Sequence, residues 1–139
     1  MARKKRPSAA EIATALGATT PVGTLHILFF VPSLQRTGEA IDHDFWVREA
    51  LDIFGRLFRG APAYPRARGV WRDDERGELE FEQPTIVFTY ANPADFTAQA
   101  RRRLRVFLHR VGRQTNQGEV GIVIDGRYYG ITDFDDEDE

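Results

Sequence analysis

Two titratable residues in the last third of the chain, His109 and Glu119, are of the types that carry acid–base chemistry. Between them runs a loop, residues 112–119, whose sequence GRQTNQGE concentrates amide side chains. A buried glutamate at the start of a strand can act as a general base if its surroundings raise its pKa. Arginines beside His109 would lower the pKa of the imidazole and keep it neutral. The pattern is therefore typical of one edge of a ligand site, or equally of a solvated helix face followed by a polar loop.

A ligand site of this kind needs further polar groups from other parts of the chain. The candidates for a small-ligand or enzymatic site are Arg72, Glu82, His109, Gln114, Asn116, Gln117 and Glu119. This hypothesis predicts that their side chains converge in one concave pocket. These residues can also serve the structure alone. Amide side chains often hydrogen-bond the backbone of their own loop, and Arg72 can form an ion pair with Glu82 across a hairpin.

Several classes of site are excluded by what the sequence lacks. Without cysteine there is no disulfide, no thiolate metal site and no cysteine nucleophile. There is no glycine-rich phosphate loop, nucleophile elbow or repeated set of metal ligands. Asp42, His43 and Asp44 are adjacent, so on a helix they project in different directions and do not share a metal easily. We expect neither a metal nor a cofactor, and the sequence leans against an enzyme while leaving that question open.

A run of arginines offers a third hypothesis, nucleic-acid binding through the predicted helix 95–111. The candidate contacts to phosphate are Arg101, Arg102, Arg103 and Arg105. Such binding would weaken steeply as salt is added. The sequence disfavours it, because the body of the chain is neutral and the glutamates of the segment ELEFE, residues 78–82, can pair with these arginines.

The charge of the chain is concentrated at its ends. Residues 3–6 carry four positive charges and residues 133–139 carry six negative ones, while the rest has equal numbers of both signs. Such blocks are usually solvated tails, and an acidic tail can also cover a basic surface or dock on a partner. We divide the chain into a basic arm with a short helix and linker, residues 1–23, an α+β domain, residues 24–132, and an acidic tail, residues 133–139.

The hydrophobic pattern predicts the elements that would position these groups. Strands alternate apolar and polar residues, and helices gather apolar residues on one face. The elements expected in order are a strand over 24–33, a helix from 42 to about 60, a loop over 61–68, a hairpin over 69–82, a strand over 84–91, a helix over 95–111 and a hairpin over 119–131. The last hairpin turns at Asp125–Gly126, a pair that favours a type I′ turn.

The order of these elements predicts a ferredoxin-like α+β sandwich, β-α-β-β-α-β, with an extra C-terminal hairpin strand. Each helix has one apolar face, so both helices should pack on one face of a mostly antiparallel sheet. The other face of the sheet must be covered or wet. In domains of this size it often meets a second copy, and we expect a homodimer through it.

Residues 25–125 resemble a family of small bacterial proteins of unknown function with ferredoxin-like folds. The similarity lies in Phe45–Trp46, in the segment GVWRD from Gly69 to Asp73, and in FEQPTIVF and TNQGEV further on. The resemblance implies the fold and no activity. It also implies that the residues of these motifs mark a shared surface or core: Trp71, Arg72, Glu82 and Gln117.

Taken together, the sequence favours a non-catalytic, self-associating α+β domain that acts through protein–protein contacts. The oppositely charged arms would help to recognise a partner. We expect a cytoplasmic location, because no apolar run reaches the ~18 residues of a membrane span and no apolar segment of a signal peptide follows the basic start. The alternatives are a ligand-binding or enzymatic domain with a polar pocket around His109 and residues 112–119, and nucleic-acid binding.

Overall fold

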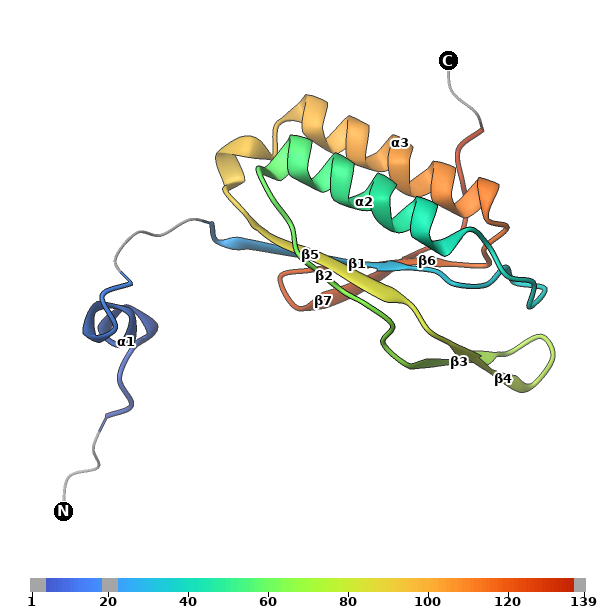
Figure 1. Ribbon diagram of the computed structural model, residues 1–139, viewed down its shortest axis with the longest axis horizontal. Coiled ribbons are helices and arrows are strands. Elements are labelled where there is room, and N and C mark those ends of the chain that lie inside the picture. The colour runs from blue at the N-terminus through green and yellow to red at the C-terminus, as the bar shows by residue number, and fades with distance from the viewer. Residues whose placement is uncertain (1–4, 19–22, 137–139) are drawn as a thin grey trace.

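The computed structural model describes residues 5–18 and 23–136 of the 139-residue chain. Its body is one antiparallel sheet of five strands, in the order β2-β5-β1-β6-β7, with helices α2 and α3 side by side on one face (Figure 1). A two-stranded sheet, β3-β4, extends from one end. The bounds are α1 Ala9–Ala15, β1 Leu25–Val31, α2 His43–Phe58, β2 Ala63–Tyr64, β3 Gly69–Asp73, β4 Glu78–Glu82, β5 Thr85–Ala91, a 3₁₀ turn Pro93–Asp95, α3 Ala98–Gln114, β6 Val120–Ile124 and β7 Arg127–Ile131.

The central strand, β1, pairs with β5 on one side and with β6 on the other, and β2 pairs with the far edge of β5. Without β3, β4 and β7, the strand order is that of a ferredoxin-like sandwich, so the predicted fold is confirmed. The extra strand β7 returns beside β6 through Asp125 and Gly126, whose φ angles of 49° and 82° are both positive. A type I′ turn needs positive φ at both of these positions, as the sequence predicted.

The second strand of the sandwich is a correction to the prediction. The segment 61–68 was expected to be a loop, yet it contributes Ala63 and Tyr64 as β2. The flanking prolines, Pro62 and Pro65, have no N–H to donate to a ladder, so this edge strand is only two residues long. The hairpin β3-β4 was expected in the main sheet and instead forms a sheet of its own, separated from β5 by Pro84.

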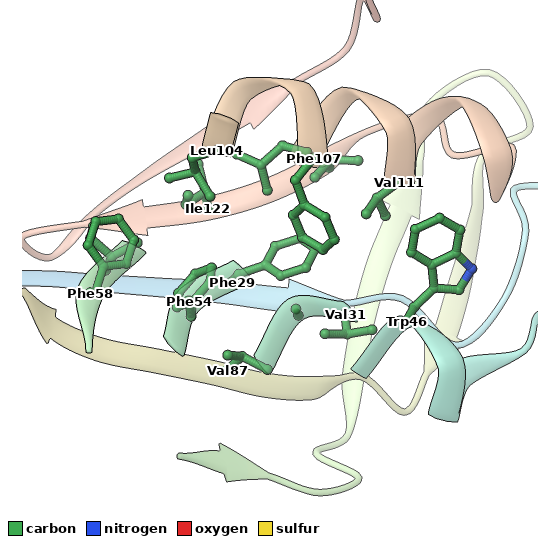
Figure 2. Packing of buried hydrophobic residues seen from close by; sticks show 14 of the residues in the cluster. Phe29, Val31, Trp46, Phe54, Phe58, Val87, Leu104, Phe107, Val111 and Ile122 are labelled. Atoms are coloured by element: carbon green, nitrogen blue, oxygen red, sulfur yellow. The ribbon is translucent and has the colours of Figure 1, made fainter. Parts of the chain in front are cut away.

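One aromatic-rich core fills the space between the sheet and the two helices (Figure 2). Alternate residues of β1 point into it, and Phe29 is fully buried. From α2, Trp46 and Phe54 reach the same space, and Phe107 of α3 lies edge-on to Phe29 with ring centroids 5.8 Å apart. The helical spacing of the apolar residues thus places one stripe of each helix on the sheet.

The ends of the helices follow local capping chemistry. The Asp42 side chain accepts a hydrogen bond from the Phe45 amide and begins α2, as predicted. The second helix was expected over 95–111, but α3 begins at Ala98 because the Thr97 hydroxyl accepts from the Ala100 amide. It also continues through Gly112, where the sequence predicted its end.

The sheet face opposite the helices is open and rich in aromatic rings. His26 stacks on Tyr90 and Tyr64 stacks on Phe88, with centroids 4.6 and 5.2 Å apart. The homodimer expected through this face stays a prediction, as does recognition of a partner by the charged arms, whose outermost residues lie outside the described ranges. Across residues 5–18 and 23–136, no helix is long and apolar enough to cross a membrane.

Candidate functional site

An open cleft of about 1020 Å³ lies where the β3-β4 hairpin faces the ends of β1 and of the β6-β7 hairpin. Its walls come from the loop 32–38 after β1, from the hairpin between Trp71 and Glu82, and from residues 117–121 together with Tyr128. Segments far apart in sequence therefore meet here because the sheet brings β1, β6 and β7 side by side. The cleft has the size of the larger small-molecule sites.

Three aromatic rings form one wall of the cleft, and we call them the aromatic trio: Phe30, Trp71 and Tyr128. They come from β1, β3 and β7, and each pair of ring centroids is 6.3 Å apart. Phe30 points to the open face of the sheet because its neighbours Phe29 and Val31 point into the core. The trio offers an apolar, π-rich surface to a bound molecule.

Glu82 ends β4 and ties the hairpin to the end of β1. Its Oε1 accepts hydrogen bonds from the backbone amides of Ser33 at 2.7 Å and Leu34 at 3.3 Å. Its Oε2 accepts from the indole N–H of Trp71 at 3.2 Å. One carboxylate thus fixes a cleft-wall loop and a member of the aromatic trio.

The predicted ion pair between Arg72 and Glu82 does not form. The hairpin register sets Arg72 opposite Leu79 and Glu82 opposite Gly69, so the two side chains are not cross-strand neighbours. Arg72 pairs instead with Asp74. Both predicted residues nevertheless line the cleft.

Glu119 also lines the cleft, and it accepts a hydrogen bond from the Tyr128 hydroxyl at 2.7 Å. Its carboxylate lies over Gly130, at which a Cβ would overlap it. Partial removal of the Tyr128 phenol from water, although 44% of the residue stays exposed, and then its hydrogen bond to Glu119 raise the pKa of the phenol, which therefore stays protonated and donates. Glu119 itself is exposed, so the burial required for the predicted general base is missing.

Some charged side chains of the cleft form ion pairs, and two carboxylates do not. Its three arginines pair with carboxylates of the cleft itself: Arg36 with Glu75, Arg72 with Asp74, and Arg76 with Asp73 and Glu80. Within the part of the chain that the structure describes, Glu82 and Glu119 receive hydrogen bonds only from neutral donors. The cleft therefore holds two carboxylates without a cationic partner, beside the aromatic trio.

The polar loop, residues 112–119, contributes fewer of its predicted side chains to the cleft than expected. Gln117 lines the cleft, and its amide donates to the Leu34 carbonyl at 2.7 Å. Gln114 and Asn116 are exposed and do not line it. Asn116, with φ 49°, is the left-handed residue of the loop.

The prediction that His109 lines one pocket with the polar loop is not met at the cleft. His109 is buried on α3, away from the cleft, and its Nδ1 accepts the backbone N–H of Asp135 at 2.7 Å. Burial is the main cause that lowers the pKa of His109; Arg105 and Arg113 lower it too, and Asp135 opposes them. The sequence placed this histidine on a solvated face because it did not show that residues 133–136 cover that face.

The arginine stripe remains on the surface of α3, where all four predicted nucleic-acid contacts are exposed. Arg105 is bound to Asp135, with two hydrogen bonds of 2.8 and 2.9 Å, rather than to the glutamates of β4. Arg101 lies over the Phe96 ring. Nucleic-acid binding by Arg102 and Arg103 stays a disfavoured prediction. In the described ranges no group of three or more histidines or carboxylates could hold a metal ion.

Sequence reasoning missed Phe30 and Tyr128 as site residues. Both are apolar or aromatic positions in strands, for which the core is the ordinary interpretation. The signal was the strand alternation: Phe30 is out of phase with the buried residues of β1, and Tyr128 pairs with Val123 on the same open face. The placement of β1 and β7 on the two sides of β6, which sequence does not give, was needed to use it.

In comparisons with protein-family models and with curated protein sequences, nothing matches this chain. Two solved structures share its fold. A phage SAM lyase in complex with S-methyl-5′-thioadenosine is 14% identical, with a TM-score of 0.60 over 82% of this chain and 95% of that chain. A phage SAM lyase in the apo state is 17% identical, with a TM-score of 0.54 over 81% of this chain and 92% of that chain.

These neighbours correct our main functional expectation. A non-catalytic domain of unknown function that acts through protein–protein contacts was favoured, and the likeness to a named lyase contradicts this expectation. The resemblance to a bacterial family stays a prediction.

Proposed function

We propose that this chain is an enzyme that binds S-adenosylmethionine (SAM) in the cleft and cleaves it to S-methyl-5′-thioadenosine. The observation that carries the proposal is the pair of carboxylates without a cationic partner, Glu82 and Glu119, beside the aromatic trio. The shared fold with SAM lyases supports it over four-fifths of the chain. A cytoplasmic location stays part of the proposal.

The chemistry of SAM suits these walls. Its sulfonium and ammonium groups are cations, which carboxylates and aromatic faces both attract. Its adenine can stack on an aromatic side chain, as bases do in other proteins. Because Glu82 is held by three neutral donors and Glu119 by one, neither has to give up an ion pair when the cation binds.

This reaction requires that the substrate be held in one conformation more than it requires a strong acid. The carboxylate of SAM can attack its own side-chain carbon next to sulfur, so that a C–O bond closes a five-membered lactone as the C–S bond breaks. The electron pair of the C–S bond stays on sulfur, and the leaving group is the neutral thioether S-methyl-5′-thioadenosine. No proton donor is needed for that departure. Cleft walls that hold the reacting carbon chain in one conformation would accelerate the reaction. The hydrogen bond from the Tyr128 hydroxyl holds Glu119 in place in such a wall.

The direct test incubates the purified protein with SAM and measures S-methyl-5′-thioadenosine by liquid chromatography and mass spectrometry. A protein-free sample corrects for spontaneous breakdown of SAM. We expect product above that background, and about a tenfold lower kcat/KM in Glu119→Gln, because the variant loses the attraction between the carboxylate and the sulfonium, which is about 1–4 kcal/mol for unit charges about 4 Å apart in surroundings between bulk water and a protein surface. Asp44→Asn, in the exposed first turn of α2, is the matched control and should keep wild-type activity.

Binding measured by calorimetry separates charge recognition from recognition of the nucleoside. If Glu82 and Glu119 act on the sulfonium, SAM binds more tightly than the neutral S-methyl-5′-thioadenosine, and Glu119→Gln reduces that preference. Equal affinities of both compounds for wild type would refute the role of the carboxylates. Absence of both product and binding would refute the proposed function.

A further inference from the structure

After β7, residues 133–136 pass beside the C-terminal part of α3 (Figure 1). Residues 133–136, which we call the latch, lie against the outer side of that helix. They belong to the segment expected to be a solvated acidic tail. Their contacts with α3 are specific, and none of them involves the cleft.

Asp135 makes most of the polar contacts of the latch. Its carboxylate accepts two hydrogen bonds from Arg105, and its backbone carbonyl accepts one from Arg113 at 2.6 Å. Its backbone N–H donates to Nδ1 of His109 at 2.7 Å. One residue is therefore held by three side chains that follow each other at four-residue spacing on one face of α3.

Phe134 supplies the apolar contact. Its ring lies directly over Gly112, where any Cβ would overlap it, and edge-on to His109 with centroids 6.1 Å apart. The glycine costs the helix up to about 1 kcal/mol relative to alanine, and the Phe134 contact explains its place inside α3. Helix and latch are thus shaped for one another.

The hydrogen bond between Asp135 and His109 forms only when the imidazole is neutral. Nδ1 accepts the Asp135 N–H, so the latched histidine is neutral and carries its proton on Nε2. A proton on Nδ1 would point at the N–H of Asp135, and the hydrogen bond between the two groups would be lost. Four charged groups face the ring: Arg105 and Arg113 disfavour the imidazolium, while Asp133 and Asp135 favour it, the latter with an oxygen 3.4 Å from Nδ1.

We propose that residues 133–136 form a pH-dependent latch on α3, which neutral His109 holds closed and protonated His109 releases. Release would free Arg105 and Arg113 from their contacts with Asp135 and uncover the bare backbone of Gly112. The latch is distinct from the SAM cleft, so this proposal does not depend on the proposed function.

The direction of the pH effect follows from burial. Burial in the latched state lowers the pKa of His109, so the released state binds a proton more readily than the latched state. Latching is therefore at full strength above the ordinary histidine pKa of about 6.5 and weakens as the pH falls below it. One proton changes the latch equilibrium by at most about tenfold per pH unit. Arg105 lowers the pKa of Asp135, so loss of that carboxylate charge belongs to a more acidic range.

The test is nuclear magnetic resonance of the ¹⁵N-labelled full chain at pH 7.5 and pH 5.0. The heteronuclear NOE of Phe134, Asp135 and Asp136 reports their order on the picosecond-to-nanosecond timescale. We expect values like those of α3 at pH 7.5 and a clear decrease at pH 5.0, while the amides of α3 and β6 stay ordered. Values that stay high at pH 5.0 in wild type would overturn the proposal.

Two variants assign the effect to His109. In His109→Asn, the amide oxygen can replace Nδ1 as acceptor but does not titrate in this range, so the latch should stay ordered at both pH values. The same decrease in this variant as in wild type would overturn the role of His109. Phe134→Ala should reduce order at both pH values and leave α3 folded; a latch that keeps its order without the ring would refute the geometry. His26→Asn, on the open face, is the control that should behave as wild type.

Discussion

Replacing Glu82 by alanine should detach the hairpin from the sheet and lower the free energy of unfolding. The change leaves three donors without their acceptor: the amides of Ser33 and Leu34 and the indole of Trp71. Each hydrogen bond contributes about 0.5–1.5 kcal/mol, more when the acceptor is charged. Because the two amides are only partly buried and the indole bond is exposed, we expect a total loss of about 2–4 kcal/mol.

A double-mutant cycle isolates the share of Trp71. Trp71→Phe keeps an aromatic ring in the trio and deletes the N–H. Measured by urea denaturation with circular dichroism, the coupling between Glu82→Ala and Trp71→Phe should be about 1 kcal/mol, because a single hydrogen bond joins the two side chains.

The control for this cycle is Glu78→Ala, an exposed glutamate at the other end of β4. It should change stability by less than about 0.5 kcal/mol. If Glu82→Ala were as mild as Glu78→Ala, the carboxylate would not hold the hairpin. A coupling below about 0.3 kcal/mol would mean that the indole bond contributes nothing.

Two further substitutions test the core and the cleft. Phe54→Ala removes a fully buried ring and should cost about 3–5 kcal/mol in urea denaturation, whereas Val106→Ala on the exposed side of α3 should cost under about 1 kcal/mol; equal losses would refute the core assignment. Gly121→Ala places a Cβ 2.5 Å from the Tyr128 hydroxyl oxygen, so it should displace the ring from Glu119 and weaken SAM binding in calorimetry. Gly55→Ala, in α2 away from the cleft and with nothing within 4 Å, is its control, and unchanged binding by Gly121→Ala would refute a role for Tyr128.

The fold could be predicted because its strongest signals are local. The strand run ending at Pro32 and the Asp125–Gly126 turn each specify a conformation with a few neighbouring residues. Strand β2 could not be predicted in this way. Ala63 and Tyr64 lie between prolines, and only pairing with the edge of β5 makes them a strand.

The candidate site was predicted in part, and the failures have one physical cause. Arg72, Glu82, Gln117 and Glu119 do line one cleft. Their partners, however, are set by strand register and by contacts between distant segments, such as Glu82 with the amide of Ser33, 49 residues away. His109 was misplaced for the same reason, since a segment 26 residues later in the chain buries it.

The central position of β1 has a consequence for how the chain folds. Its two neighbours, β5 and β6, are made long after it, and the last paired residue of β6, Ile124, follows Val31 by 93 residues. At about 5–20 residues per second, a ribosome needs roughly 5–20 s to make that stretch. During this time the apolar run LHILFFV has no strand on either side. Folding should therefore be slow for a domain of this size, and the nascent chain is most prone to aggregate before β6 emerges.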